Sequence, residues 1–398
     1  MVARQPMMAP MQRSFDVIVV GLGAMGSCTA AALSRRGARV LGVDRFDPPH
    51  ARGSSHGGSR VIRLSYFEHP DYVPLLREAY DGFDRLSRDA GVQLRHETGL
   101  VVGGAPGNPT CAGMLRSARE HGLAVAAIDG RELRRLHPQF RVADDWEVVT
   151  EARGGFVRPE ATIAAALSLA ERGGVEILRH TAVSAWGSGA DRAWIDTPHG
   201  RFEGGALVLC GGAWMPGLLG GSAAPVSLRP TRETIVWIDD ADDPRWRSDA
   251  MPVWLFDRGD APAVYGIPAF ADMGSPRGLK VGLHGRGPAI SPEQFDGALD
   301  VPVDGDIVAE TLAATCAHVP SAHGRAVAAT RHCFYTMSPD TDFVLGLHPS
   351  HPRVAIGGGC SGHGFKFAPV LGEVLADLSL TGVTARPIGF LRPTRFNP

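Results

Sequence analysis

The sequence lacks the features that mark membrane and secreted proteins. No run of about 18 apolar residues is present, which argues against a membrane-spanning helix. Residues 1–14 contain no continuous apolar segment of the kind that forms a signal peptide. The 6 cysteines are scattered, without a Cys-x-x-Cys pair or the spacing of a disulfide framework, as expected for free thiols in a reducing compartment. We therefore expect a cytoplasmic protein that is not associated with a membrane, with residues 1–13 forming a flexible tail.

Charge and short motifs exclude several further classes. The formal net charge is −2, and no basic face interleaved with aromatic residues suggests a nucleic-acid partner. Gly-x-Ser-x-Gly, His-Glu-x-x-His and Walker lysine motifs are absent, and the histidines lack the spacing of metal ligands, so we expect no bound metal. The 44% hydrophobic and 21% charged residues are typical of a globular protein, and the length allows roughly two to three domains.

A dinucleotide-binding pattern is present near residue 20. An apolar segment leads into Gly21-Leu-Gly23-Ala-Met-Gly26, an alanine-rich helix expected over 27–36, and a second apolar segment that ends at Asp44. In such a unit the first glycine permits a tight turn, the second lets the backbone approach a pyrophosphate, and the third lets helix and strand pack closely. The helix N-terminus offers free N–H groups to the phosphates. Asp44 is placed to accept hydrogen bonds from a ribose. The pattern predicts a dinucleotide without deciding which one.

A second glycine-rich turn lies near the carboxyl end. The segment Gly357-Gly-Gly-Cys-Ser-Gly-His363-Gly-Phe-Lys366-Phe follows an apolar strand and precedes a helix expected over 369–380. Glycines at this density let the backbone approach a ligand closely. Lys366 beside a helix N-terminus creates an electropositive pocket, which suits a reduced flavin or a carboxylate.

The remaining segments predict an α/β protein (α+β, two-domain). Apolar residues at every third or fourth position predict a helix over 72–90, and Pro159 opens a helix that ends at Arg172. Alternating apolar segments over 231–290 predict antiparallel strands of a separate sheet. We expect a discontinuous Rossmann-like dinucleotide-binding domain, made of residues 14–100, 155–230 and 333–398. We expect a second, mostly antiparallel substrate domain, made of residues 101–154 and 231–332.

Four segments carry a pattern shared with a known family. They are the N-terminal fingerprint, Gly53-Ser-Ser-His-Gly-Gly-Ser-Arg60-Val-Ile-Arg63, Cys333-Phe-Tyr335-Thr336, and Ser361-Gly-His363-Gly-Phe-Lys366-Phe. With them the chain resembles, over nearly its whole length, the monomeric sarcosine oxidase and N-methyltryptophan oxidase family of FAD-dependent amine oxidases. The resemblance implies an active site at the junction of the two domains. It also implies that O2 is reduced to H2O2 while a secondary-amine (N-methyl) amino acid, such as sarcosine or N-methyltryptophan, is oxidised to an imine. Hydrolysis of the imine then gives the amino acid and formaldehyde.

The resemblance implies which residues hold FAD. Cys333 matches the cysteine whose sulfur is joined covalently to the flavin, and we expect Arg331 and His332 to favour its thiolate. Arg60 is expected to contact the flavin or a phosphate, and His363 to contact the flavin region. The fingerprint then holds the AMP half of FAD, through Gly21, Gly23, Gly26 and Asp44.

The resemblance also implies a set of residues around the substrate. Arg63 and Lys366 match the pair that binds the substrate carboxylate, where two cations form charge-assisted hydrogen bonds to one anion. Lys280 matches the lysine beside the flavin at which O2 reacts, because a fixed ammonium stabilises superoxide. Three more side chains are expected in this cavity, two of them catalytic (His284 and Tyr265) and one in contact with the substrate (Tyr335).

Alternatives remain open at the level of the sequence. Segment 271–277 is longer than in sarcosine-specific relatives, which leaves a cyclic imino acid (pipecolate-like) or a biosynthetic amine open as the substrate. An NAD-dependent dehydrogenase would explain the fingerprint but not Cys333, and a non-catalytic flavin carrier would not need three converging cations. We expect a monomer whose partners are a small-molecule amino-acid substrate and O2. The other cysteines are expected to be packing residues, apart from Cys360, whose role stays open: Cys28, Cys111, Cys210 and Cys316.

Overall fold

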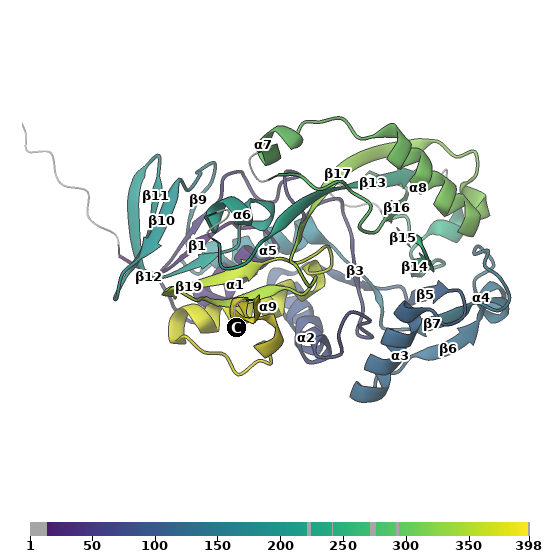
Figure 1. Cartoon of the computed structure of the whole chain (residues 1–398), viewed down its shortest axis with the longest axis horizontal. Helices are drawn as coiled ribbons and strands as arrows, with labels where there is room; N and C mark the ends of the chain where they lie inside the picture. Colours follow the sequence, from purple (N-terminus) through teal and green to yellow (C-terminus); the bar gives the residue numbers. More distant parts are fainter. Residues whose placement is uncertain (1–13, 221–223, 241, 271–275, 292–293, 397–398) are drawn as a thin grey trace, which may run out of the picture.

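Two large β-sheets organise the molecule. The computed structural model describes residues 14–220, 224–240, 242–270, 276–291 and 294–396. Within these residues lie two eight-stranded sheets and one three-stranded sheet, with the two large sheets at opposite ends of the molecule (Figure 1). The mixed α/β architecture that the sequence predicts is confirmed.

The first large sheet carries the dinucleotide-binding pattern. Its central strand β1 (Phe15–Val20) pairs in parallel with β2 (Val40–Val43) on one side and with β12 (Gly200–Leu209) on the other. These strands are nearly continuous apolar runs because helices cover the sheet. The other strands of this sheet are β9 (Glu176–Leu178), β10 (Ala185–Ser188), β11 (Ala193–Thr197), β18 (Val344–His348) and β19 (His351–Gly358).

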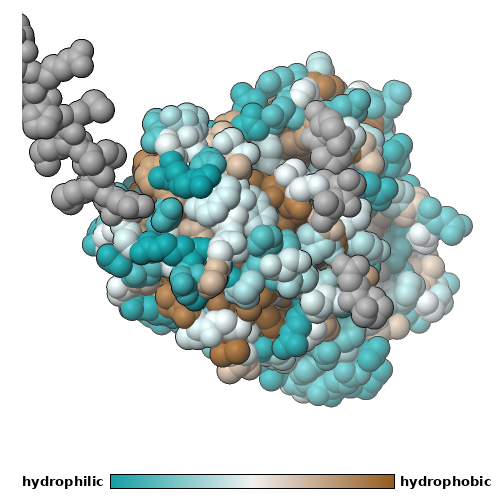
Figure 2. All heavy atoms as spheres, turned by 60° about the vertical axis from the view of Figure 1, so that its left-hand side comes forward, coloured by the Kyte–Doolittle hydropathy of each residue, from teal (hydrophilic) through white to brown (hydrophobic). Residues whose placement is uncertain are grey.

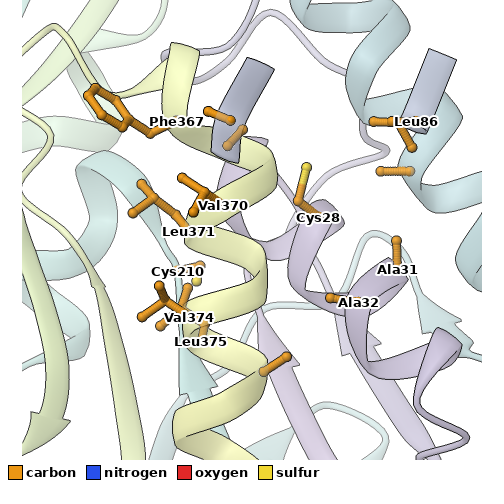
Figure 3. Close-up of a cluster of buried hydrophobic side chains, with 14 of the residues drawn as sticks. Cys28, Ala31, Ala32, Leu86, Cys210, Phe367, Val370, Leu371, Val374 and Leu375 are labelled. Atoms are coloured by element: carbon orange, nitrogen blue, oxygen red, sulfur yellow. The ribbon is translucent and has the colours of Figure 1, made fainter. Parts of the chain in front are cut away.

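Four helices pack around this sheet and enclose the largest apolar cluster: α1 (Ala24–Arg35), α2 (Tyr72–Ala90), α5 (Pro159–Arg172) and α9 (Ala368–Thr381). Figure 3 shows α1 and α9 side by side, with Cys28 and Cys210 among the apolar side chains between the elements. The two helices approach so closely that a Cβ on Gly372 would lie 2.6 Å from the carbonyl carbon of Cys28. The predicted helices 72–90 and 159–172 are confirmed at both ends.

The second large sheet is mostly antiparallel, as the alternation over 231–290 predicts. Only its pairing between β14 and β5 is parallel among the described strands. Strand β17 passes through residue 333 without interruption, so the predicted domain boundary there falls inside a strand, and residues 333–337 belong to this sheet. In spatial order the strands are β17 (Val327–Met337), β13 (Arg229–Ile238), β16 (Leu279–Leu283), β15 (Ala261–Ile267), β14 (Val253–Arg258), β5 (Leu100–Gly104), β7 (Glu147–Glu151) and β6 (Ala126–Asp129).

A small third sheet connects the two halves. Its strand β3 (Arg60–Ile62) pairs with β8 (Gly155–Val157), which also pairs with β4 (Arg95–Glu97). Strand β3 contacts the short helix η6 (Phe365–Phe367), so two sequence motifs far apart in the chain meet here. The remaining helices are α3 (Pro109–His121), α4 (Gly130–Leu136), η1 (Gly212–Trp214), α6 (Met215–Leu218), η3 (Pro244–Trp246), α7 (Phe295–Ala298), α8 (Gly305–His318), η5 (Pro320–Ala322), η7 (Gly389–Leu391) and η8 (Pro393–Phe396).

The surface is of mixed polarity. On the face shown in Figure 2, hydrophilic residues cover most of the surface, with smaller groups of apolar residues between them. None of the helices in the described part of the chain combines the length and the apolar character needed to cross a membrane.

Candidate functional site

A groove of about 600 Å³ lies at the carboxyl ends of the central parallel strands. In open α/β sheets this edge is where ligands bind, because the loops after the strands and the helix N-termini meet there. Its walls include the first residues after three neighbouring strands: Gly21 and Gly23 after β1, Asp44 after β2, and Gly211 and Gly212 after β12.

The three fingerprint glycines have different surroundings. Gly21 has φ +85°, and a Cβ there would lie 2.5 Å from the carbonyl oxygen of Cys210. A Cβ on Gly26 would lie 1.8 Å from the carbonyl oxygen of Gly21, so only glycine lets α1 start so close to β1. A Cβ on Gly23 would meet no atom within 4 Å and would project into open space beside the groove. Gly21 and Gly26 therefore serve the packing of the chain, whereas Gly23 leaves room for a ligand.

Asp44 is buried at the same edge and is held by the backbone. Its Oδ2 accepts a hydrogen bond from Leu22 N at 2.7 Å, and its Oδ1 accepts one from Phe46 N at 2.8 Å. Each carboxylate oxygen retains a second lone pair. Asp44 thus has capacity for a hydroxyl donor in the groove while its side chain stays fixed.

A second, smaller cavity of about 100 Å³ lies against one face of the second large sheet. Successive residues of a strand point to opposite faces, so the register decides which side chains share this face. Tyr265 and Gly282 are paired between β15 and β16, and Lys280 lies two residues from Gly282. Glu233 and Cys333 are paired between β13 and β17. The side chains of Tyr265, Lys280, Glu233 and Cys333 line the cavity. Other lining residues follow the same alternation: Leu100, Val102, Ile235, Val253, Leu255, Ile267 and Tyr335.

Cys333 lies where the groove and the cavity meet. Its Sγ is 3.5 Å from the carbonyl oxygen of Ser54, a residue that lines the groove, and Cys333 itself lines the cavity. Arg60 donates a hydrogen bond from Nη2 to this sulfur at 3.2 Å. The expectation that His332 supports the thiolate is wrong, because His332 points to the opposite face of β17 and pairs with the carbonyl oxygen of Val301 at 2.8 Å. Arg60 is the cation in contact with the sulfur, and it lines the cavity beside Cys333.

Arg63 and Lys366 converge on one end of the cavity. The guanidinium carbon of Arg63 and the Nζ of Lys366 lie 4.3 and 5.3 Å from the centre of the Tyr66 ring. Both cations are 5% exposed, which makes their charges effective on any anion that enters. Burial, together with the nearby Arg63 charge, lowers the pKa of Lys366 to about 7.

Glu68 already occupies this basic end, which the sequence did not predict. Its two carboxylate oxygens accept hydrogen bonds from Nη2 of Arg63 at 2.8 and 2.6 Å. Burial alone would raise the pKa of Glu68, but Arg63, His363 and Lys366 outweigh it and hold that pKa at about 2. Glu68 is therefore an anion bound where a substrate carboxylate is expected.

His363 is fixed within the protein by both ring nitrogens. Its Nδ1 lies 2.5 Å from the Tyr66 hydroxyl, and its Nε2 lies 3.0 Å from the carbonyl oxygen of Thr341. Because a carbonyl only accepts, Nε2 carries the proton and Nδ1 accepts from Tyr66. Burial lowers the pKa of His363 to about 4, so the ring is neutral at neutral pH. The carbonyl oxygen of His363 accepts a hydrogen bond from Lys366 Nζ at 2.7 Å, which orients the lysine.

Lys280 is a buried cation held by main-chain oxygens. Its Nζ donates to the carbonyl oxygens of Gly57 and Ser59 at 3.0 and 2.6 Å. Burial and the Arg60 charge lower the pKa of Lys280 well below its usual value. His284 lies in the same cavity, with Nδ1 3.3 Å from the Tyr335 hydroxyl, and burial lowers its pKa as well.

Sequence reasoning missed three acidic residues around the two cavities. Glu160, in the first turn of α5, accepts hydrogen bonds from Gly57 N at 2.5 Å and Gly58 N at 3.1 Å, and so fixes the loop before β3. Its place directly after Pro159 was the available signal. For Glu68 and Glu233 no local motif exists, because their roles depend on contacts between distant segments. Segment 271–277, predicted to border the cavity, lies outside the described residues for 271–275.

The groove and the cavity together fit an FAD. Gly23 leaves space at the start of α1, and Cys333 stands at the far end, where the two hollows join. His56 is 1% exposed on the loop between them, and neither of its ring nitrogens has a hydrogen-bond partner within the described ranges. Buried polar atoms are rarely left without partners, so His56 is a group that a bound molecule would satisfy.

Comparison with known proteins gives the same cofactor. A family model described as FAD dependent oxidoreductase matches residues 16–378. A monomeric sarcosine oxidase from Streptomyces avermitilis is 39% identical over 393 residues, which cover 97% of this chain and 98% of the relative. An N-methyl-L-tryptophan oxidase from Salmonella agona is 32% identical over 384 residues, covering 96% and 99%.

Solved structures share the fold at lower identity. L-proline dehydrogenase from P. horikoshii superposes with a TM-score of 0.83 at 20% identity, over 97% of this chain and 98% of that one. The family that the sequence motifs predict is confirmed, and the dinucleotide left open by the fingerprint is FAD. The chain belongs to the FAD-dependent oxidoreductase family that includes monomeric sarcosine oxidase and N-methyl-L-tryptophan oxidase.

Proposed function

We propose that this FAD-dependent enzyme oxidises a small secondary-amine amino acid, above all an N-methyl amino acid such as sarcosine, with O2 as the electron acceptor. The products are H2O2 and an imine, which water converts to the amino acid and formaldehyde. The observation that carries this proposal is the convergence of Arg63 and Lys366 on one end of a buried cavity that also contains Lys280. Such a cavity binds a carboxylate and excludes water from the atoms beside it.

The two cations would hold the substrate by its carboxylate. Charge-assisted hydrogen bonds of this kind contribute about 1.5–3 kcal/mol each, and two of them fix orientation as well as position. Glu68 competes for Arg63, so the incoming carboxylate has to take over hydrogen bonds that Glu68 now accepts. With its carboxylate held at this end, the substrate extends its amine along the cavity wall towards Tyr335 and His284.

When bound, FAD accepts two electrons from the amine and transfers them to O2. Lys280 supplies the fixed positive charge that stabilises the superoxide formed at this stage. We further propose a covalent thioether between Cys333 and a methyl carbon of the flavin, which the position of Sγ at the junction of groove and cavity supports. The S–H bond and one C–H bond of that methyl group would break, and the two protons and two electrons would pass to the flavin, which O2 would reoxidise with formation of H2O2. The Arg60 hydrogen bond would hold the sulfur in position. Asp44 and Gly23 would hold the AMP half of the cofactor.

The volume of the cavity favours a compact substrate. About 100 Å³ suits an amino acid with a small side chain better than one with an indole ring. N-methyltryptophan, a cyclic imino acid of the pipecolate type and a biosynthetic amine are the competing substrates, and they belong in the same assay. We also propose that the enzyme acts as a cytoplasmic monomer, which size-exclusion chromatography with light scattering tests for the assembly state.

Two measurements test the proposed function. Acid precipitation of the purified protein should leave yellow flavin in the pellet, and the Cys333→Ala variant should release it to the supernatant. Flavin in the supernatant of the unaltered protein would contradict the covalent bond. A peroxide assay should give turnover with sarcosine and N-methylalanine above that with N-methyltryptophan, pipecolate and glycine. Absence of peroxide with every secondary amine would contradict the reaction itself.

A further inference from the structure

Glu233 is a buried carboxylate on the wall of the small cavity. Its side chain lies on β13 opposite Cys333, and the residue is 3% exposed. Oε1 accepts a hydrogen bond from the Thr231 hydroxyl at 2.7 Å, and Oε2 accepts one from Gly287 N at 2.9 Å. Arg286 acts on the same carboxylate through its backbone N–H and its charge, whereas burial raises the pKa of Glu233. Glu68 differs, because it is paired directly with the guanidinium of Arg63.

The surroundings are shaped to hold this carboxylate. A Cβ on residue 287 would lie 2.8 Å from the carboxyl carbon of Glu233 and 2.2 Å from the carbonyl oxygen of Arg232, so glycine lets the backbone close around the acid. A buried carboxylate is costly unless donors and charges compensate it. A carboxylate has about four lone-pair sites, and Thr231, Gly287 and the backbone N–H of Arg286 use three of them. One site remains for a donor in the cavity.

The cavity is therefore polarised. Arg63 and Lys366 gather around the Tyr66 ring at one end, whereas Glu233 lies on the strand that pairs with β17 and Cys333. A molecule whose carboxylate is held by the two cations would present its other groups to Glu233. An apolar side chain would leave the remaining lone pair of that carboxylate without a partner, and a hydrogen-bond donor would satisfy it.

We propose that Glu233 selects amino acids whose side chain carries a hydrogen-bond donor, a hydroxyl or an ammonium, on the carbon next to the α-carbon. This inference rests on the proposed function, because it names the class of secondary-amine substrate that the same cavity takes. It also makes a statement about binding alone, which is testable without turnover.

Three carboxylates with one carbon skeleton isolate the effect. Propionate, 3-hydroxypropionate and 3-aminopropionate carry only hydrogen, a hydroxyl or an ammonium on carbon 3 and lack the amine that is oxidised. Isothermal titration of the flavin-loaded protein should show the hydroxyl and ammonium ligands binding at least about tenfold more tightly than propionate. Glu233→Met should abolish this preference. Glu233→Gln, which keeps an acceptor but loses the charge, should retain the hydroxyl preference and lose the additional gain from the ammonium.

The control is Glu132→Met on α4, a partly exposed position that lines neither the groove nor the cavity and should retain the preference of the unaltered protein. For each variant, the affinities for the hydroxyl and ammonium ligands are divided by its affinity for propionate. Its flavin absorbance spectrum shows whether it has folded. If Glu233→Met does not fold, Glu233→Gln decides the question. An unchanged ligand preference in the Glu233 variants would overturn the proposal. In the turnover assay, the rate of peroxide formation should be higher with N-methylserine than with N-methylalanine only while Glu233 is present. Equal losses of rate with both substrates in the Glu233 variants would place Glu233 at the reacting amine instead. Preserved ligand preference without oxidation of any amine would contradict the proposed function and leave this inference intact.

Discussion

The cofactor groove and the substrate cavity are built in opposite ways. The groove is lined by glycines and other residues that follow neighbouring strands of a parallel sheet, and the glycine motif and the acid that mark it stand close together in the sequence. The cavity is lined by side chains from several strands of the other large sheet, from β3 and from η6. The comparison teaches that cofactor binding in this chain depends on local backbone shape, whereas reactivity and selectivity depend on side chains assembled from distant segments.

The two regions also differ in electrostatics. Asp44, the acid of the groove, is satisfied by two backbone N–H groups. The cavity contains buried lysines and buried acids whose pKa values are shifted by burial and by neighbouring charges or hydrogen bonds: Lys280, Lys366, Glu68 and Glu233. Perturbed groups of this kind concentrate at functional sites, because the same burial that makes them costly makes their charges effective.

The largest effect is expected in the backbone of the groove, from Gly26→Ala. The added Cβ would lie 1.8 Å from the Gly21 carbonyl oxygen, and relieving that clash costs more than about 3 kcal/mol. Gly23→Ala is the matched variant, because its Cβ meets no protein atom within 4 Å. We expect Gly26→Ala to unfold at a much lower temperature, and Gly23→Ala to fold normally but to contain less flavin. Circular dichroism melts and the ratio of flavin absorbance to protein test this, and full flavin content in Gly26→Ala would contradict it.

The next effect is expected in the cavity, from Lys280→Met. Loss of a preorganised charge beside a developing anion typically slows a reaction by about 10²–10³-fold. Stopped-flow measurements should show that reduced enzyme reacts with O2 more slowly by this factor. Anaerobic reduction by the amine should change far less, since Arg63 and Lys366 remain in place. Unchanged oxygen reactivity would show that Lys280 serves only to hold Gly57 and Ser59.

The contrast between the two regions also explains what the sequence predicted. Helices 72–90 and 159–172 were predictable at both ends because their apolar spacing and their Pro and Gly boundaries are local. The domain boundary at 333 was not, because the pairing of β17 with β13 is a contact between distant segments. The error for His332 is of another kind, because it follows from the alternation of side chains along β17, which puts successive residues on opposite faces. Glu68 and Glu233 carry no motif, and only the folded arrangement brings them to the cavity.

Glu68→Gln separates the roles of the pair at the basic end of the cavity. Without the Glu68 charge, Arg63 would be free to bind an added carboxylate, and propionate should bind about 10- to 100-fold more tightly. Breaking a buried ion pair should also lower stability by about 3–5 kcal/mol. Calorimetric titration and thermal unfolding measure the two effects on the same sample. Weaker propionate binding in this variant would mean that Glu68 positions Arg63 for the ligand instead of competing with it.

The smallest effect is the pH dependence of carboxylate binding, and it follows from Lys366. Its pKa is lowered to about 7, so the free protein loses this cation as the pH rises through 7, while a bound carboxylate favours the protonated lysine. Propionate should therefore bind about tenfold more weakly at pH 8 than at pH 6. The neighbouring groups do not titrate in this window in a way that mimics it: the pKa of Glu68 is held at about 2, that of His363 is lowered to about 4, and that of the Cys360 thiol is raised to about 12.

Burial also lowers the pKa of His284. Lys366→Met should bind propionate weakly at both pH values and lose the dependence, whereas Lys366→Arg should bind it at both, because a guanidinium stays charged. The groove offers the internal comparison, because Asp44 accepts hydrogen bonds from two main-chain donors, and its basic neighbour among the described residues is His50, with Nε2 3.6 Å from Oδ1. In Cys333→Ala, which lacks the proposed covalent bond, flavin retention should stay constant from pH 6 to pH 8 while propionate affinity falls. If flavin retention and propionate affinity fell together as the pH rises, the groove and the cavity would share one pH response. The difference between the two regions would then not extend to their titration.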